Sequence, residues 1–307
     1  GTQCIVPIED TIPTEEGVTL PQNLILSKHI RLSGEDVKKG QMLLHRGDKI
    51  DAHQITLLAS QGISHIKVHK KPRVALFASG NELKMHFEQV TEYQLYNTNT
   101  PTLLARAQEL GCEVEFIGTA QDTLIDIKAH IQGALECDLV ITSGGVSVGD
   151  ADFTKEAFGD FGYDILFDKV DIKPGKPTTF GIIGDTVILN LPGNPLAAAI
   201  NFELFGQSII HAMSGAKSKF IQPIKAKMKH DYKLRAGRRS IVPGVYDGEY
   251  FVVCEHFAPG MVSPLAYANA YVMISEECGL LSAEAQVNII STKFNFTSTQ
   301  FVSLVSG

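Results

Sequence analysis

From Arg73 onward, continuous apolar segments alternate with segments whose apolar residues have helical spacing. The strand-like segments are RVALFAS (73–79), CEVEFIG (112–118), DLVIT (138–142), DILFD (164–168) and TVILNL (186–191). The helical patterns run from Thr100 to Gly111, from Leu124 to Leu135, after Asp152, and from Pro195 to about Met213. Strands without alternating polar positions are buried on both faces, which predicts an α/β fold with a doubly wound, mostly parallel sheet covered by helices.

The segments on either side of this α/β region have different patterns. Residues 1–38 contain short β-rich runs (CIVPI, LILSKHIRL) between polar turns, and we interpret them as the remnant of an N-terminal β domain that begins upstream. Residues 39–72 predict a connector, with a helix between Asp51 and Gly62 followed by the strand-like ISHIKVHKKP. The α/β domain covers 73–217, and the β-like runs AKMKHDYKL, RSIVPGVY, YFVVCEHF and QVNIISTKF predict a small C-terminal β domain over 218–307.

Composition excludes several classes of protein. A net charge of -7 argues against a general nucleic-acid binder, which needs a surplus of Lys and Arg. The five cysteines are scattered and form no CxxC pair, so we expect neither a disulfide framework nor a zinc site, and a reducing cytoplasm fits best. We expect no membrane span and no signal peptide, because the apolar stretches are too short and the first residues lack a basic and apolar leader.

The strongest candidate site loop follows the strand DLVIT, because ligands of such sheets bind beyond the carboxyl ends of the strands. In DLVITSGGVSVGDADFTK (138–155), Ser143, Gly144 and Gly145 form a turn whose N–H groups can bind an oxyanion. Asp150 and Asp152 follow, where they can reach a metal-bound phosphate. A tight turn with Asp152 as a helix cap explains the same pattern equally well.

A second candidate loop, here named the Lys loop, is KVDIKPGKP (169–177), which places Lys169, Lys173 and Lys176 around a Pro-Gly turn after a strand. Ammonium groups this close repel one another unless an anion offsets them, so phosphate or another tetrahedral oxyanion is a natural ligand. A solvated charged loop is the alternative, and from this loop alone the two interpretations are equally good.

Further candidates follow other strands of the same sheet. They are Pro192, Gly193, Asn194 and Pro195 in LNLPGNP, Glu82 in FASGNEL, and Asp122 in GTAQDTL. Each alone is explained as a connector, a cap or a solvated acid. Together with Asp150, Asp152 and the lysines, the acids at one sheet edge would instead suit magnesium and a phosphorylated ligand. The cluster Arg235, Arg238 and Arg239 is either a solvated hairpin or an anion-binding group folded over the Lys loop.

Four segments in this order and spacing resemble the MoeA/gephyrin E-domain family: SGNEL (79–83), TSGGVSVGDAD (142–152), IKPGKP (172–177) and LPGNP (191–195). The likeness extends to GEDVKKGQMLL and LLASQGISHIKV before the sheet, and to AGRRSIVPGVY and SPLAYANAYV after it. It covers essentially the whole chain. Family members carry a complete β domain upstream, of which GTQCIVPIED matches only the end, and they often have Asp where this chain has Asn97.

The resemblance implies a molybdopterin molybdenumtransferase of molybdenum cofactor biosynthesis. Such an enzyme takes adenylylated molybdopterin and molybdate as substrates with Mg2+, and releases molybdenum cofactor and AMP. The acids that the resemblance assigns to magnesium and the pterin phosphate are Glu82, Asp122 and Asp152, with Asp36 as a further site acid. The basic and polar residues that it assigns to phosphate and molybdate are Lys169, Lys173, Lys176, Arg235 or Arg238, and Ser263.

The resemblance also implies a homodimer, with a molybdopterin adenylyltransferase as a further partner. Two other functions stay open from the sequence. The adenylyltransferase of the preceding step resembles residues 73–215, but it lacks the flanking domains and the IKPGKP loop. A non-catalytic scaffold, as in gephyrin's E domain, would be expected to lose the acids or lysines that this chain retains.

Overall fold

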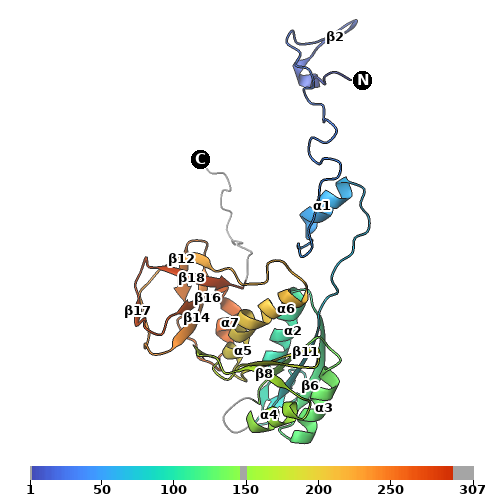
Figure 1. Cartoon of the computed structure of the whole chain (residues 1–307). Helices are drawn as coiled ribbons and strands as arrows, with labels where there is room; N and C mark the ends of the chain where they lie inside the picture. Colours follow the sequence, from blue (N-terminus) through green and yellow to red (C-terminus); the bar gives the residue numbers. More distant parts are fainter. Residues whose placement is uncertain (1, 146–150, 293–307) are drawn as a thin grey trace. The chain divides into compact units, whose positions relative to one another are not determined.

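The structure, a computed structural model, describes residues 2–145 and 151–292, except for the side chains of residues 151 and 152. It divides into two compact units, one that ends at Ile66 and one that begins at Lys67. Figure 1 labels the helices and strands of both. Within the described residues, every helix is too short or too polar to cross a lipid bilayer.

The first unit contains little regular structure. Its elements are the 3-10 helix η1 (Ile8–Asp10), the antiparallel strands β1 (Ile12–Thr14) and β2 (Gly17–Thr19), and the helix α1 (Ala52–Ser60). The predicted cap of α1 is confirmed, because the Asp51 carboxylate accepts a hydrogen bond of 2.9 Å from the His53 N–H.

Three strand-like stretches of the sequence, at 4–8, 24–32 and 63–72, do not form strands. In the second stretch, Ser27 and His29 have φ angles of 64° and 59°. These values break the extended conformation that strand pairing needs. A β-rich run also needs a neighbouring strand to complete its hydrogen-bond ladder, and these three stretches pair with none of the described strands.

The second unit is built on a six-stranded sheet with the strand order β6-β3-β7-β11-β10-β8. The strands are β3 (Arg73–Ser79), β6 (Glu113–Ala120), β7 (Leu139–Ser143), β8 (Asp164–Asp168), β10 (Thr179–Ile183) and β11 (Thr186–Leu191). The strands β6, β3, β7 and β11 pair in parallel, whereas β10 is antiparallel to both β11 and β8. The doubly wound, mostly parallel sheet predicted from the sequence is therefore confirmed, with β10 as a strand that the sequence did not reveal.

Helices cover both faces of this sheet, and Figure 1 shows α3 and α4 on one side with α2, α5 and α6 on the other. Their bounds are α2 (Asn99–Glu109), α3 (Leu124–Ala134), α4 (Ala151–Gly159), α5 (Pro195–Asn201) and α6 (Gln207–Met213), with the π-helical turn η2 (Phe202–Gly206) between the last two. In β3, Val74 and Leu76 face one hydrophobic core while Ala75 and Phe77 face the other. Burial on both faces explains why the strand is apolar throughout.

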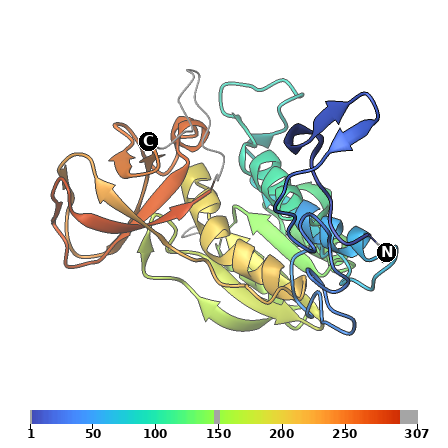
Figure 2. The same ribbon diagram turned by 90° about the horizontal axis from the view of Figure 1, so that it is seen from above.

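The C-terminal part is a second sheet with the order β15-β12-β18-β16-β14-β9, and an additional β14–β15 pairing curls it into a barrel-like shape. Its elements are β12 (Ile224–Met228), β14 (Arg239–Tyr246), β15 (Tyr250–Val253), β16 (Ala270–Ile274) and β18 (Gln286–Ser291), with the short pair β13 (Tyr232–Lys233) and β17 (Leu280–Leu281) and the helix α7 (Ser263–Tyr267). Figure 2 shows the long helix of residues 195–213, in yellow, beside these orange and red strands. The predicted small β domain is confirmed, although β16 and α7 were missed.

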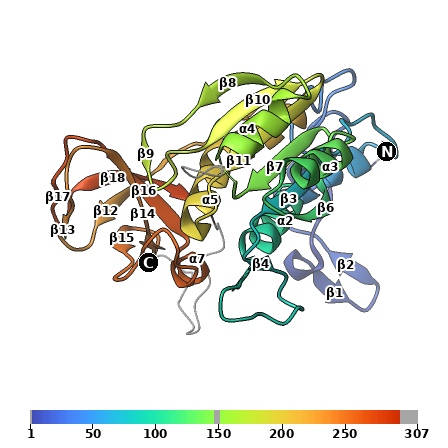
Figure 3. The same cartoon turned by 90° about the horizontal axis from the view of Figure 1, so that it is seen from below.

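One strand of this second sheet comes from the α/β region. The strand β9 (Ile172–Lys173) lies in the Lys loop and pairs in parallel with β14, with Ile172 opposite Arg239 and Lys173 opposite Ser240. Figure 3 shows the chain leaving β8 and running to the C-terminal strands through β9. Ile172 is buried in an apolar cluster with residues of α5, β14 and β16. The Lys loop thus connects β8 and β10 of the central sheet and adds a strand to the second sheet.

A buried ion pair joins α2 to the π-helical turn. The Arg106 guanidinium donates to both carboxylate oxygens of Glu203, at 2.7 and 3.1 Å. Glu203 is 4% exposed, and Gln207 also donates to its carboxylate. The hydrogen bond with Glu203 raises the pKa of Arg106 further above its usual value, so the guanidinium stays charged.

We predict that Arg106→Met lowers the free energy of unfolding by about 2–4 kcal/mol, because it leaves Glu203 charged and buried without its partner. The double variant Arg106→Met/Glu203→Leu should recover most of that loss. Urea unfolding measures both changes. The control Lys227→Met, which removes an exposed pair with Glu249, should have little effect. Equal losses for Arg106→Met and Lys227→Met would contradict a stabilising buried pair.

Candidate functional site

Five strands end at one edge of the central sheet. Because β10 is antiparallel to both β8 and β11, β8 runs in the same direction as the parallel strands. One residue row crosses the sheet here, through Thr142, Asn190, Thr179 and Asp168 on β7, β11, β10 and β8. The loops that follow β3, β6, β7, β11 and β8 therefore leave from a common edge, and Figure 3 shows these strands side by side.

Buried hydrogen bonds hold this row in register. The Thr142 hydroxyl donates to Asn190 Oδ1 at 2.8 Å, and Asn190 Nδ2 donates to Thr179 Oγ1 at 2.8 Å. Asn190 Nδ2 also lies 3.4 Å from the Tyr163 hydroxyl oxygen. Burial raises the pKa of Tyr163 to about 12, so this hydroxyl stays protonated near neutral pH. Side-chain hydrogen bonds thus reinforce the backbone hydrogen bonds between these strands close to the edge where the candidate loops begin.

The loops after β3 and β6 are bonded to each other. Asp122 Oδ2 accepts from the Asn81 N–H at 3.2 Å, and Asn81 Oδ1 accepts from the Asp122 N–H at 3.1 Å. Glu82 folds back over Gly80, where a Cβ would lie 2.9 Å from both carboxylate oxygens. The two candidate acids therefore lie on adjacent loops at one end of the sheet edge.

The loop after β7 is packed too closely for side chains at its glycines. A Cβ at Gly144 would lie 2.4 Å from the Ser79 carbonyl oxygen. A Cβ at Gly145 would lie 2.4 Å from Ser79 Oγ and 2.5 Å from Thr154 Oγ1. Both glycines also have positive φ angles, of 97° and 65°. Contacts within the protein therefore require glycine at both positions, and the binding of an oxyanion by their N–H groups stays a prediction.

The loop after β11 is joined to the loop after β7. The Gly144 N–H donates to the Leu191 carbonyl oxygen at 3.3 Å, and Ser143 Oγ donates to the Pro192 carbonyl oxygen at 3.5 Å. Asn194 precedes α5 and makes no side-chain cap bond, while Pro195 occupies the first turn. The predicted neighbours Ser143, Gly144, Pro192, Asn194 and Pro195 are thus brought together at the centre of the edge.

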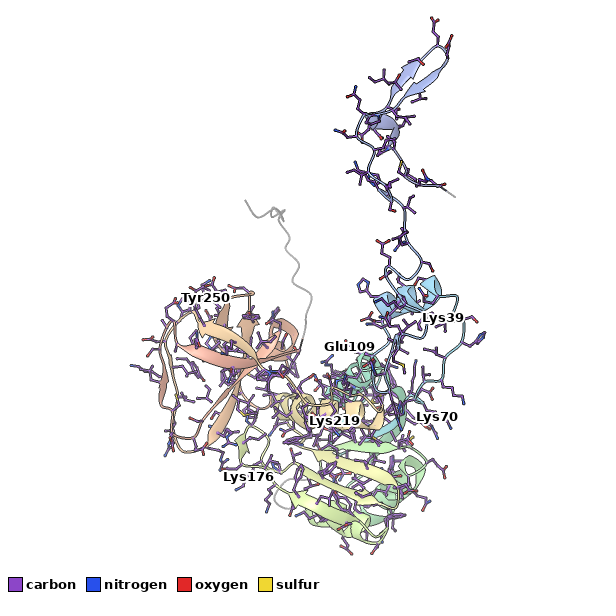
Figure 4. The ribbon with its side chains drawn as sticks, turned by 45° about the horizontal axis from the view of Figure 1, so that its top comes forward. Lys39, Lys70, Glu109, Lys176, Lys219 and Tyr250 are labelled. Carbon is purple, nitrogen blue, oxygen red and sulfur yellow. The ribbon has the colours of Figure 1, made fainter. Side chains whose placement is uncertain are left out.

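The Lys loop begins where β8 ends. Its turn is closed by a hydrogen bond from the Val170 N–H to the Lys176 carbonyl oxygen, at 2.9 Å. Asn201 of α5 packs directly on the turn, because a Cβ at Gly175 would lie 1.8 Å from Asn201 Nδ2. The side chains of Lys169, Lys173 and Lys176 are all exposed, and Figure 4 labels Lys176 on the loop between the central sheet and the C-terminal strands.

The C-terminal domain adds one of the two predicted arginines to the Lys loop. Arg238 Nε lies 3.8 Å from Asp171 Oδ1, which belongs to that loop. Arg235 is exposed two residues after β13, and within the described part of the chain it forms no ion pair with the Lys loop. Ser263 is the first residue of α7, a helix that contacts both β14 and α5. Arg238 is therefore the better-supported arginine.

Sharing an edge does not place all these residues in one small pocket. Five strand spacings separate β6 from β8, which corresponds to about 24 Å at about 4.8 Å per strand. Glu82 and Asp122 follow the strands β3 and β6 at one end of this row, and the Lys loop follows β8 at the other.

Three predicted acids lie outside this arrangement or outside what the structure describes. Asp36 belongs to the first compact unit, where its carboxylate lies 3.8 Å from Arg31 Nη2. Asp150 lies outside the described residues, and Asp152 is described only as a backbone position in α4. Among the side chains that are described, no three His, Cys, Asp or Glu residues are close enough together to hold a metal ion.

Sequence reasoning missed two polar residues at the edge. Lys155 Nζ, on α4, lies 2.7 Å from Oδ2 of Asp168, which is the residue directly before the Lys loop. Asn99 of α2 donates from Nδ2 to Ser143 Oγ at 2.6 Å and to the Gly193 carbonyl oxygen at 2.7 Å. Asn99 also lines a cavity of about 270 Å³ between α2, α5 and α7. The sequence marks it only as part of a helix start.

The position of Asn97 has a structural explanation. Asn97 is 3% exposed, and its side chain accepts a hydrogen bond from the Thr100 N–H at 3.0 Å and donates to Thr100 Oγ1 at 2.8 Å. These bonds satisfy the first turn of α2. Asn at this position therefore acts as a helix cap.

Comparisons with known proteins match the whole architecture. A family described as "Probable molybdopterin binding domain" matches residues 75–212, the MoeA N-terminal region (domain I and II) matches 1–62, and the MoeA C-terminal region (domain IV) matches 225–291. A crystal structure of the molybdopterin biosynthesis moea protein from Pyrococcus horikosii is similar with a TM-score of 0.78 and 28% identity, over 95% of this chain and 72% of that one.

Two relatives are similar over nearly all of this chain. The molybdopterin molybdenumtransferase of Staphylococcus epidermidis is 31% identical over 310 residues, which cover 96% of this chain and 72% of the relative. The protein of the same name from Staphylococcus aureus (strain COL) is 32% identical over 308 residues, which cover 95% of this chain and 71% of the relative. With this coverage and all three matching regions in order, the chain belongs to the MoeA family of molybdopterin molybdenumtransferases.

Proposed function

We propose that this protein inserts molybdenum into adenylylated molybdopterin, using molybdate and releasing molybdenum cofactor and AMP. The observation that carries the proposal is that the loops with Glu82, Gly144, Asn194 and Lys169 all leave from one edge of the sheet. A row about 24 Å long suits a substrate that joins a pterin to a nucleotide through phosphates.

The charge distribution along this edge supports two anion-binding regions. Molybdate and phosphate are both tetrahedral dianions, and the lysines of the Lys loop with Arg238 provide positive charge for them. The backbone N–H groups of Gly144 and Gly145 suit a phosphate oxygen at the centre. In this proposal the protein accelerates the reaction by holding the two anions close together and stabilising charge on the departing AMP, without a covalent nucleophile.

Magnesium is part of the proposal as the ion that offsets phosphate charge when it is bound. Carboxylates are the ligands that Mg2+ prefers, and the chain offers Glu82, Asp122, Asp150 and Asp152 for it. Of these four acids, Glu82 and Asp122 have described side chains. They lie on adjacent loops, which are joined by the hydrogen bonds between Asn81 and Asp122. Two acids with water and substrate phosphates are a sufficient ligand set for this ion.

The proposal includes a homodimer, a molybdopterin adenylyltransferase that supplies the substrate, and a cytoplasmic location. Scattered cysteines without CxxC pairs support a reducing compartment.

The second candidate function is that of the adenylyltransferase. An assay with ATP and molybdopterin in place of the adenylylated substrate distinguishes it from the first. The Lys loop, whose strand β9 joins the C-terminal sheet, favours the molybdate-dependent reaction, because the adenylyltransferase lacks this loop.

AMP release from adenylylated molybdopterin, magnesium and molybdate tests the proposal. We expect Lys173→Ala to lower the molybdate-dependent rate roughly tenfold to hundredfold, because a cation is lost from the proposed anion site. The control Lys225→Ala removes an exposed lysine from β12 and should retain the wild-type rate. Equal rates for the two variants would remove the Lys loop from the mechanism, and no AMP release by the wild-type protein would refute the function.

The shape of the Lys loop gives a further prediction. Gly175→Ala should raise the KM for molybdate and lower the free energy of unfolding by about 2–4 kcal/mol, because its Cβ would collide with Asn201. Gly248→Ala is the matched control, since Gly248 has a φ of 114° against 119° for Gly175 but no heavy atom within 4 Å of its Cβ position. The molybdate KM and urea unfolding distinguish the two. Identical behaviour would show that only backbone strain matters at Gly175.

A further inference from the structure

Asn99 lies where two of the candidate site loops meet, yet it belongs to neither. It is the first residue of α2 and is 9% exposed. Its Nδ2 donates to Ser143 Oγ at 2.6 Å and to the Gly193 carbonyl oxygen at 2.7 Å. Ser143 is the last residue of β7 and Gly193 lies in the loop after β11, so one amide group joins the start of one loop to the next loop.

Both bonds are shorter than the direct hydrogen bonds between the described residues of these two segments. The bonds from the Gly144 N–H to Leu191 and from Ser143 Oγ to Pro192 are longer, at 3.3 and 3.5 Å. The backbones also touch, because a Cβ at Gly193 would lie 3.5 Å from Gly144 Cα. Both N–H groups of the Asn99 amide have an acceptor, which determines how the amide is oriented.

The bridge starts from a rigid position. Asn97 caps the first turn of α2 through Thr100, which is fully buried. The bridged loops, in contrast, contain Gly144, Gly145 and Gly193, which have no side chains with which to anchor themselves. A binding group works best when surrounding residues hold it in place before the ligand arrives.

We propose that Asn99 is a positioning residue that holds the loops after β7 and β11 together, so that their backbone groups are ready for the adenylylated pterin substrate. The inference rests on the proposed function, because it assigns these central loops to that substrate. Asn99 acts through Ser143 and Gly193. The Lys loop is held separately, by β14 and by Asn201, so the molybdate end of the site does not depend on Asn99.

Hydrogen–deuterium exchange tests the positioning role without any substrate. We expect Asn99→Ala to raise exchange at least severalfold in peptides that cover 139–145 and 187–195. The matched control is Asn269→Ala, which removes a partly buried amide that makes two hydrogen bonds with the backbone of Tyr246, outside both loops. If exchange in these peptides rises equally in both variants, or in neither, the positioning role is wrong.

Kinetics then tests what the bridge contributes. Loss of two buried hydrogen bonds should raise the KM for adenylylated molybdopterin about tenfold in Asn99→Ala, while the KM for molybdate changes less than about twofold. Asn269→Ala should keep both KM values. A merely structural role would lower the active fraction, and hence the apparent kcat, and would leave both KM values unchanged. That result would overturn the proposal.

A double-mutant cycle with Ser143→Ala separates the routes of action. If Asn99 acts partly through Ser143, the double variant should raise the substrate KM by less than the product of the two single effects. Fully multiplicative effects would exclude Ser143 as an intermediary. A wild-type protein without AMP release, combined with the expected exchange pattern, would refute the proposed function and leave the bridge between the loops established.

Discussion

The hydrogen-bonded register of the central sheet determines where every candidate site loop begins. Parallel pairing of β6, β3, β7 and β11 brings their carboxyl ends to one edge, and the antiparallel strand β10 returns β8 to the same direction. The buried Thr142, Asn190 and Thr179 side chains reinforce this row. The hydrogen bonds between the Gly144 loop and the LPGNP loop depend on the register of β7 and β11. A shift of one residue between these two strands would therefore break them.

The two ends of the site depend on different supports. At the acidic end, Asn81 and Asp122 bond reciprocally, so the loops after β3 and β6 hold each other. At the basic end, the Lys loop contributes β9 to the C-terminal sheet and packs against Asn201 of α5. The C-terminal domain therefore supplies Arg238 and also helps to determine the shape of the loop that carries the lysines.

Much of the fold follows from local patterns that a sequence displays. The apolar runs of β3, β7 and β11 have no polar alternation because both faces are covered, and Asp51 and Pro195 mark helix starts through backbone chemistry. The short strands β10 and β16 were missed because each depends on its neighbours for definition. In the strand-like run 24–32, positive φ angles at Ser27 and His29 interrupt the extended conformation, so its backbone hydrogen bonds with residues 3 and 5 do not extend into a strand.

For the site, local patterns in the sequence identify which loops carry acids, glycines and lysines, because strand ends and turn residues are local features. Which loops touch, and that Asn99 bridges Ser143 and Gly193, follows only from the folded arrangement of the strands. Asn99 and Ser143 are 44 residues apart, and no local pattern relates them. Contacts of this kind arise only when strand order and register bring distant segments together, and many different sequences share the same local patterns.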